Sequence, residues 1–207
     1  YTYADFCVGA WSFGGNLITA RQGAGVFGTP SAAVAFGGSV PSETNITENY
    51  DGTSWSASGN LSQVRRLMGG AGTQNAGITA GGFSSGTIKT CTEEYDGSSW
   101  AAGGALSIAR YGPITLGTQT AALSVGGSNP GMLTCTEEYN GIAWNKGGGL
   151  NNGRTNFKGD GPSNSLGIIA GGTDDIINFS STEEYNVTNP VNCGLYCFWN
   201  SLSYTTT

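Results

Sequence analysis

A short repeated segment constrains this chain more than any other feature of its sequence. The clearest copy runs from Thr90 to Trp100 and reads TCTEEYDGSSW. Near copies run from Ile46 to Trp55 (ITENYDGTSW) and from Thr134 to Trp144 (TCTEEYNGIAW). Self-similarity at a fixed interval is the signature of repeat architectures, so we interpret the chain as a repeat protein.

Two weaker copies stand at the ends of the series. Ser181 to Asn186 (STEEYN) keeps the tyrosine, but Pro190 occupies the position where the tryptophan is expected. Tyr3 to Trp11 places Phe6 at the tyrosine position and Trp11 five residues later. The sequence therefore predicts a degraded unit at each end of the repeats.

Other residues recur at the same interval as the segment. An arginine follows each tryptophan, and a pair of glycines ends an apolar run in each unit. The tryptophans are Trp11, Trp55, Trp100 and Trp144, the tyrosines Tyr50, Tyr95, Tyr139 and Tyr185, the arginines Arg21, Arg65, Arg110 and Arg154, and the glycine pairs begin at Gly37, Gly81, Gly126 and Gly171. Trp11 and Trp55 are 44 residues apart, and Tyr139 and Tyr185 are 46 apart. This interval is in the range of propeller blades and is too long for leucine-rich or ankyrin units.

Within a unit the pattern indicates β-structure. The apolar run after Arg65 is interrupted by polar residues at 72–75, which predicts two short strands joined by a turn. Corresponding breaks lie at 28–31, 117–120 and 161–165. The pairs Asp51-Gly52, Asp96-Gly97 and Asn140-Gly141 are hairpin signals, because such residues tolerate the positive φ of a tight turn. We therefore expect four strands per unit and no helix.

An apolar strand ending in Gly-Gly, followed by a Tyr and then by a Trp, resembles the kelch repeat, and the resemblance covers about Tyr3 to Tyr185. It implies an all-β fold, a kelch-like β-propeller of about four to five four-stranded blades that is either incomplete in this chain or closed by the half-unit. The expected units span about residues 12–55, 56–100, 101–144 and 145–188, with a half-unit at 1–11 and a C-terminal cap or tail at 189–207.

The segment TEEYDGSSW, followed by AAGGALSIARYG, is similar to the glycine-rich kelch-like repeats in structural proteins of tailed bacteriophages, particularly marine and cyanobacterial ones. This resemblance implies a non-enzymatic virion protein, in a tail fibre or on a capsid surface. Its propeller loops would bind a host-surface glycan or another virion subunit, including a second copy of itself.

Two alternatives remain open. A secreted lectin or adhesin of a cell is favoured by the cysteines and by Asn-x-Ser/Thr sequons at Asn45, Asn60, Asn178 and Asn186. A glycoside hydrolase needs two carboxyl groups beside one bond, which Glu93-Glu94 or Glu137-Glu138 would have to supply. Because the pair recurs in each unit, whereas a catalytic pair is needed once, we interpret the carboxylates as structural.

Composition narrows the function further. A net charge of −6 with only eight Lys and Arg argues against nucleic acid as a partner, and no apolar run is long enough to insert in a membrane. The absence of His leaves no Ser-His or Cys-His pair and excludes copper ligation of the galactose oxidase type. We expect no enzyme activity, no metal and no cofactor.

The repeated polar and aromatic residues are expected to build the framework. One glutamate of each pair should point inward and need a partner such as a backbone amide or a repeat arginine. The arginines either hydrogen-bond between units or form a ring that holds an anion. The tyrosines and tryptophans either pack between units or present faces on which a sugar stacks.

Recognition is expected in the loops that follow the glycine pairs, because a repeated scaffold leaves its loops free to differ. The candidate binding residues are Ser39, Glu43, Asn45, Phe83, Lys89, Asn129, Met132, Asp174 and Asp175. Asp174 and Asp175 form the only acidic doublet in these loops, which is either a cation site or solvated surface.

Five cysteines leave at least one without a partner inside the chain. Cys91 and Cys135 share a repeat position and are interpreted as small buried side chains. Cys193 and Cys197 are the better disulfide candidates, with each other or with Cys7.

Overall fold

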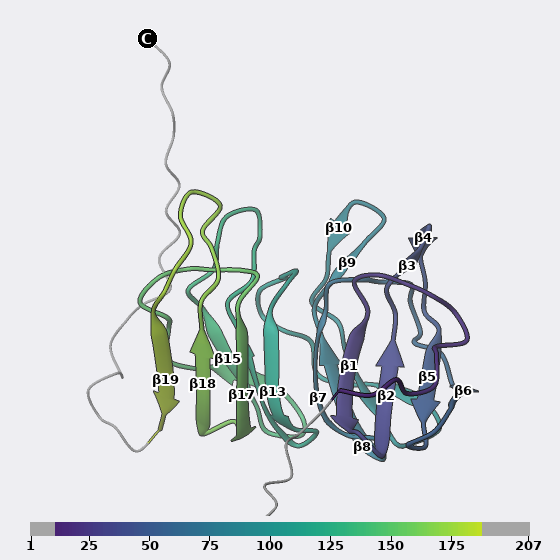
Figure 1. Ribbon diagram of the computed structural model, residues 1–207. Helices are drawn as coiled ribbons and strands as arrows, with labels where there is room; N and C mark the ends of the chain where they lie inside the picture. The colour runs from purple at the N-terminus through teal and green to yellow at the C-terminus, as the bar shows by residue number, and fades with distance from the viewer. Residues whose placement is uncertain (1–10, 188–207) are drawn as a thin grey trace, which may run out of the picture.

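The computed structural model describes residues 11–187, whose strands form antiparallel β-sheets and which contain no helix (Figure 1). The half-unit at 1–11, apart from its last residue, and the cap at 189–207 lie outside the described residues. No helix in the described range is available to cross a membrane.

Three sheets have four strands each, in the arrangement expected for one repeat unit. Sheet 1 contains β1 (Gly25–Thr29), β2 (Ala32–Phe36), β5 (Thr47–Tyr50) and β6 (Trp55–Ser58). Sheet 2 contains β7 (Gly69–Thr73), β8 (Ala76–Ala80), β11 (Thr92–Tyr95) and β12 (Trp100–Ala102). Sheet 3 contains β13 (Ile114–Thr118), β14 (Ala121–Val125), β15 (Thr136–Tyr139) and β16 (Trp144–Lys146).

Sheet 4 has three strands within the described residues, β17 (Lys158–Ser163), β18 (Leu166–Ala170) and β19 (Thr182–Asn186). Two small hairpins, β3 (Ser39–Val40) with β4 (Ser42–Glu43) and β9 (Phe83–Ser84) with β10 (Thr87–Ile88), extend from sheets 1 and 2. The expected breaks between the first two strands of each unit are confirmed, although the β17–β18 pairing shifts register between Asp160 and Ser163.

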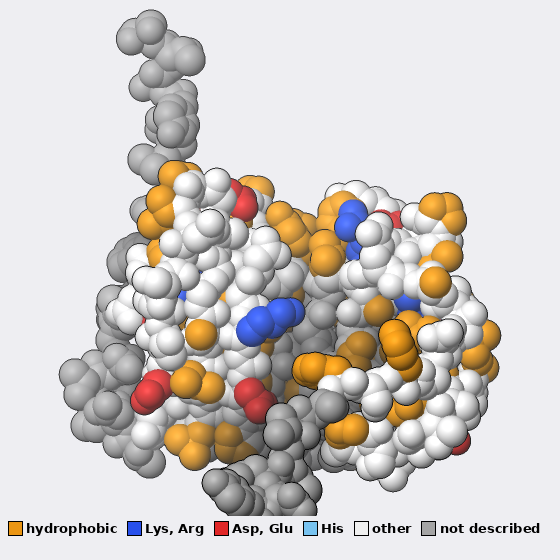
Figure 2. Space-filling model, viewed as in Figure 1, with side chains coloured by type: hydrophobic (Ala, Val, Ile, Leu, Met, Phe, Trp, Pro, Cys, Tyr) orange, Lys and Arg blue, Asp and Glu red, His pale blue; other side chains and the backbone are white. Residues whose placement is uncertain are grey.

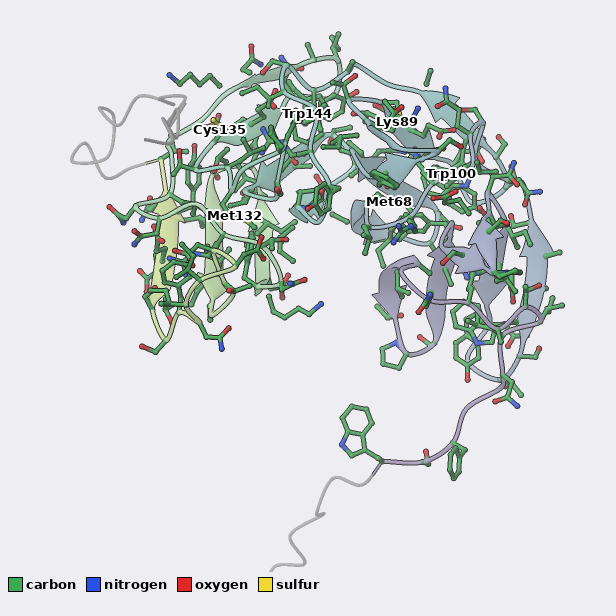
Figure 3. All side chains as sticks on the ribbon, turned by 90° about the horizontal axis from the view of Figure 1, so that it is seen from above. Met68, Lys89, Trp100, Met132, Cys135 and Trp144 are labelled. Atoms are coloured by element: carbon green, nitrogen blue, oxygen red, sulfur yellow. The ribbon has the colours of Figure 1, made fainter. Side chains whose placement is uncertain are left out.

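The four sheets follow one another in an arc. Their first strands contact in the order β1, β7, β13 and β17, and Figure 3 shows the arc open between sheet 1 and sheet 4. Figure 2 shows that charged side chains on one face are few and separate, without a gathering of Lys and Arg.

The Gly-Gly pairs allow two units to approach closely. Gly81 and Gly82 have φ of 72° and 105°, a left-handed conformation that glycine adopts without strain. A Cβ on Gly81 would lie 2.6 Å from the carbonyl oxygen of Arg110, while the Gly82 amide donates to that same oxygen at 2.8 Å. The glycine pair of one sheet therefore bonds directly to the arginine segment that precedes the next sheet.

The hydrophobic core lies between neighbouring sheets rather than in a single centre. Between sheets 1 and 2 it contains Phe27, Val34, Phe36, Leu61, Met68, Tyr95 and the partly buried Trp100. Between sheets 2 and 3 it contains Ala71, Ile78, Ala80, Leu106, Ala122, Tyr139 and Trp144. Between sheets 3 and 4 it contains Leu116, Leu123, Val125, Leu150, Phe157 and Ile169. Each unit is thus stabilised by its neighbours, as in other repeat proteins.

Candidate binding rim

The repeat arginines belong to the framework and form no anion site. Arg65 and Arg110 are fully buried, and each donates Nη2 to a glutamate oxygen of the following sheet at 2.6 Å, Glu93 and Glu137 respectively. The same pairing joins Arg21 to Glu48 and Arg154 to Glu183. The hypothesis of an arginine ring that holds an anion is wrong, because these guanidinium groups are already paired with carboxylates inside the protein.

The inward glutamate of each unit also satisfies backbone amides. Glu137 accepts hydrogen bonds from the amides of Ser107 and Ile108, which lie in the segment leading to Arg110. Arg110 in turn donates to the carbonyl oxygens of Ser124, Gly126 and Cys135. Burial lowers the pKa of the Arg110 guanidinium, while the charge of Glu137 opposes that shift. The expected partner of the inward glutamate is confirmed.

The second glutamate of each pair contacts the next sheet. Tyr139 donates its hydroxyl to Glu94 Oε1 at 2.5 Å, and Tyr185 donates in the same way to Glu138. In sheet 1, Asn49 replaces the second glutamate and accepts from the Tyr95 hydroxyl at 3.0 Å. Both carboxylates of the pairs in sheets 2 and 3 are therefore engaged in structural contacts at the junctions, whereas Glu184 of sheet 4 is exposed.

The tryptophans of sheets 2 and 3 also hydrogen-bond to the preceding sheet. Trp100 donates Nε1–H to Thr47 Oγ1 at 2.9 Å, and Trp144 donates to Thr92 Oγ1 at 2.8 Å. Each stacks on the tyrosine of its own sheet, with ring centroids 4.7 Å apart for Tyr95 and Trp100. These rings pack between sheets, so they do not present a face to a sugar.

The aromatic residues near the start of the described range differ from this pattern. Trp55 stacks on Tyr50 and donates to the carbonyl oxygen of Gly15, because no earlier sheet is present within the described residues. Trp11 is fully exposed, at 104% of its reference area. Its assignment as a structural repeat residue is wrong for this structure, since it contacts no sheet in the way that Trp100 does.

The four variable loops lie on one edge of the arc. The β3–β4 and β9–β10 hairpins, the loop after β14 and the loop after β18 all extend upward in Figure 1, and the Asp-Gly and Asn-Gly turns lie at the opposite ends of the strands. We call the edge formed by residues 39–45, 83–89, 128–133 and 173–179 the loop rim. Its loops share almost no sequence, although the strands that carry them are repeated.

A polar hollow of about 280 Å³ lies on the loop rim between sheets 1 and 2. It is lined by Gln22, Ser39, Pro41, Ser42, Glu43 and Arg66. Arg66 Nε lies 3.5 Å from Glu43 Oε1, and the Arg66 guanidinium lies 5.2 Å from the centroid of the Phe83 ring. The structure thus brings three predicted residues, Ser39, Glu43 and Phe83, to one place on the rim.

Other predicted residues are separate from this hollow. The side chain of Asn45 donates to the carbonyl oxygen of Leu61 at 2.9 Å, so it holds the framework rather than presenting a free amide. Lys89, Asn129 and Met132 are half-buried on later loops. The Lys89 backbone bonds to Gly82 and Arg110, which ties this part of the loop to the framework.

The acidic doublet does not form a cation site with two aligned carboxylates. Asp174 Oδ1 accepts the amides of Ile176 and Ile177 at 3.0 and 2.8 Å, and these bonds, Ile177 first, lower the pKa of its carboxyl group. Asp175 is exposed on left-handed backbone with φ of 72°. Among residues 11–187, no group of three or more Cys, Asp or Glu side chains is placed to hold a metal ion.

Sequence reasoning missed one set of rim residues. The residue after each repeat arginine bridges to the first residue of the variable loop, as Arg66 does to Phe83 and Tyr111 does to Ser128. Gln22 and Thr155 occupy the same position before the other two loops. The signal was present, because a constant arginine is followed at this position by four different residues.

The cysteines also differ from expectation. Cys91 is a free thiol that accepts a hydrogen bond from Arg65, whereas Cys135 is buried and disulfide-bonded. The predicted burial of Cys135 is confirmed, its disulfide bond was not predicted, and Cys91 is half-buried rather than buried. Cys7, Cys193 and Cys197 lie outside the described residues.

No family model matches the sequence, and no curated protein is significantly similar to it.

Proposed function

We propose that this chain is a kelch-like β-propeller array, incomplete over the described residues, that serves as a non-enzymatic binding component of a virion. It belongs to a tail fibre or capsid surface, and its loop rim contacts a host-surface glycan or a neighbouring virion subunit. The observation that carries the proposal is the placement of four dissimilar loops on one edge of a framework whose internal contacts repeat.

The chemistry of the framework supports a binding role. The arginines and the paired glutamates, which are the candidates for acid-base work, are engaged with each other, with tyrosines and with backbone amides. The framework leaves the rim available to a partner. There Arg66 and Glu43 place a cation and an anion in the lining of one hollow, and the Phe83 ring lies beside the Arg66 guanidinium. Such a mixture suits a polyhydroxylated ligand, which combines hydroxyl groups with apolar ring faces.

A glycan array tests the rim directly. We expect the purified chain to bind a subset of glycans and the Arg66→Glu variant to lose that binding at unchanged stability, because a half-exposed ion pair contributes little to folding. Ile142→Ser is the matched control, since Ile142 is 80% exposed at a turn on the opposite edge. Equal binding by Arg66→Glu and the parent chain would place recognition elsewhere.

A secreted lectin or adhesin is the second candidate, and the disulfide at Cys135 favours it because such bonds persist outside the cytosol. Glycosylation of the sequons distinguishes the secreted protein from the virion protein. Asn45 is occupied by its bond to Leu61, but Asn178 is exposed, so a secreted eukaryotic protein should carry a glycan on Asn178. Mass spectrometry of the native protein that finds this glycan would exclude a bacteriophage source.

A further inference from the structure

Arg66 differs from the repeat arginine beside it. Arg65 is fully buried, and its guanidinium donates to two backbone carbonyl oxygens and to Glu93. Arg66 is half-buried, and within residues 11–187 its side chain hydrogen-bonds only to Glu43, through Nε at 3.5 Å. The framework therefore uses the donors of one arginine and leaves most donors of the other without a partner in the described chain.

The Arg66 guanidinium is held in place by the neighbouring loop. Its central carbon lies 5.2 Å from the centroid of the Phe83 ring, and the Arg66 and Phe83 backbones exchange hydrogen bonds of 3.0 and 2.8 Å. The Phe83 ring in turn meets the Tyr111 ring edge-on, with centroids 6.3 Å apart. A guanidinium that is already stacked loses less freedom on binding a ligand than an unsupported side chain does.

The terminal nitrogens of a guanidinium suit a carboxylate. Two parallel N–H groups reach both carboxylate oxygens at once, and such charge-assisted bonds are about twice as strong as bonds between neutral groups. Arg66 is the only cation among the four residues that follow the repeat arginines, since the others are Gln22, Tyr111 and Thr155. Among the four equivalent positions, this chemistry is thus confined to the polar hollow between sheets 1 and 2.

The rest of the hollow offers uncharged polar groups beside Glu43. Gln22, Ser39 and Ser42 line it with one amide and two hydroxyl groups, and these side chains make no hydrogen bond to other residues of the described range. The Gln22 and Ser39 backbones bond to each other, so the two side chains start from fixed positions. A volume of about 280 Å³ is just below the range of pockets that enclose a drug-sized molecule, and it therefore suits one sugar ring.

We propose that this hollow is the subsite for a sugar that carries a carboxylate, as uronic and sialic acids do. The sugar carboxylate binds the terminal nitrogens of Arg66, and the ring hydroxyls bind the side chains of Gln22, Ser39 and Ser42. The inference rests on the proposed glycan-binding role of the loop rim and names the class of glycan. In the free chain Glu43 pairs with the same guanidinium, so it competes with the sugar.

Glu43 makes the direction of one effect diagnostic. Glu43 repels a sugar carboxylate, so Glu43→Gln should raise the affinity for an acidic sugar by about two- to fivefold, as expected for a half-exposed charge pair. A neutral sugar would instead donate its hydroxyl groups to Glu43, and the same substitution would weaken its binding. The sign of the change therefore distinguishes the two kinds of ligand.

The experiment presents one set of glycans in two forms. The full chain is applied to an array of microbial and animal surface glycans, once with free carboxylates and once with the carboxylates converted to methyl esters. We expect the chain to bind glycans that contain uronic or sialic acid and to lose that binding on the esters. Binding to both forms, or to neutral glycans alone, would overturn the carboxylate subsite and leave the proposed function standing. An array without any binding would contradict the glycan-binding role itself, and this inference with it.

Variants locate the binding at this hollow, measured by calorimetric titration with the glycan that the array binds most strongly. Arg66→Gln should lower the affinity by about tenfold or more, the order expected for a hydrogen bond between charged groups. Arg66→Lys should restore only part of it, because lysine lacks the planar fork. Lys158→Gln is the matched control, since it removes an exposed cation of sheet 4 outside the hollow. Equal losses in Arg66→Gln and Lys158→Gln, or an affinity that Glu43→Gln fails to raise, would overturn the proposal. Thermal midpoints equal to that of the parent chain establish that each variant is folded.

Discussion

Arg110 and Glu137 form an ion pair that is closed to solvent on both sides, with Nη2 2.6 Å from Oε1 and side-chain exposures of 0% and 2%. The pair joins the segment before sheet 3 to β15, and the Arg110 carbonyl oxygen accepts the Gly82 amide of sheet 2. One residue therefore bonds to two sheets, by its side chain to one and by its backbone to the other.

Removing one member of this pair should strongly destabilise the fold. Arg110→Met leaves Glu137 buried without its cation, a change that costs about 3–5 kcal/mol in the free energy of unfolding. The measurement is urea denaturation, with Arg66→Met as the control because its bond to Glu43 is half-exposed and contributes about 0–1 kcal/mol. The double variant Arg110→Met/Glu137→Gln should lose less than the sum of its single changes, and strict additivity would contradict the coupling.

Alkaline pH should weaken the junction between sheets 2 and 3. Burial, and then the hydrogen bond to Glu94, raise the pKa of Tyr139 from 10.0 to about 12. A raised pKa in the folded state stabilises the protein fully below pH 10, and this stabilisation is lost as pH rises from 10 to 12. Thermal denaturation of Tyr139→Phe should show a shallower decline over that range than the parent chain does. Tyr111→Phe, which changes a rim tyrosine, should retain the steep decline.

Acid should weaken the hairpin turn that Asp96 caps. Asp96 Oδ1 accepts the amides of Ser98 and Ser99, each at 2.8 Å, and these bonds hold the pKa of its carboxyl group well below its ordinary value of 3.8. The charged form therefore stabilises the turn above pH 3.8, and this contribution is lost as pH falls toward the folded-state pKa.

The sequence provides its own control for this turn. Asn140 holds the corresponding turn of sheet 3 with an uncharged oxygen that accepts the amides of Ile142 and Ala143. Asp96→Asn should thus keep most of the stability at pH 7 and remove part of its acid dependence, while Asp96→Ala should lower the stability at pH 7 because the amides of Ser98 and Ser99 lose their acceptor. Equal stability of Asp96→Ala and the parent chain in urea would contradict the role of the cap.

The disulfide at Cys135 predicts that two peptides remain joined by this bond after proteolysis. Because Cys91 is free, proteolysis under non-reducing conditions should release a peptide of Cys135 joined to a cysteine outside residues 11–187. The candidates for that partner are Cys7, Cys193 and Cys197. Alkylation before reduction should label Cys91 first, and a Cys135 that is alkylated without reductant would contradict the linkage.

Much of the framework was predictable from the sequence because each unit repeats the same strands, turns and paired side chains. Alternation along a strand requires that one of Glu93 and Glu94 points inward, and a periodic arginine is the natural partner for it. The interval of the Asp-Gly pairs likewise predicts the hairpins, and Gly52, Gly97 and Gly141 all have the expected positive φ.

The residues that escaped prediction depend on contacts between separate segments. The sequence does not show that Asn45 bonds to Leu61, because that contact joins the segment before β5 to the segment after β6. Trp11 fits the spacing of the repeat, yet spacing does not supply a neighbouring sheet for it to pack against. The position of Arg66 on the rim follows from its bridge to Phe83, which no local pattern specifies.

The outer face of sheet 4 repeats a surface that the other junctions bury. Ile168 is 46% exposed where the aligned Leu123 is fully buried, and Glu184 is exposed where Glu94 receives a tyrosine. Since every junction uses the same few contacts, a unit inserted between two others would find matching partners on both sides. Duplication or loss of a whole unit can therefore change how many rim loops the protein displays, with no second change needed to repair the framework.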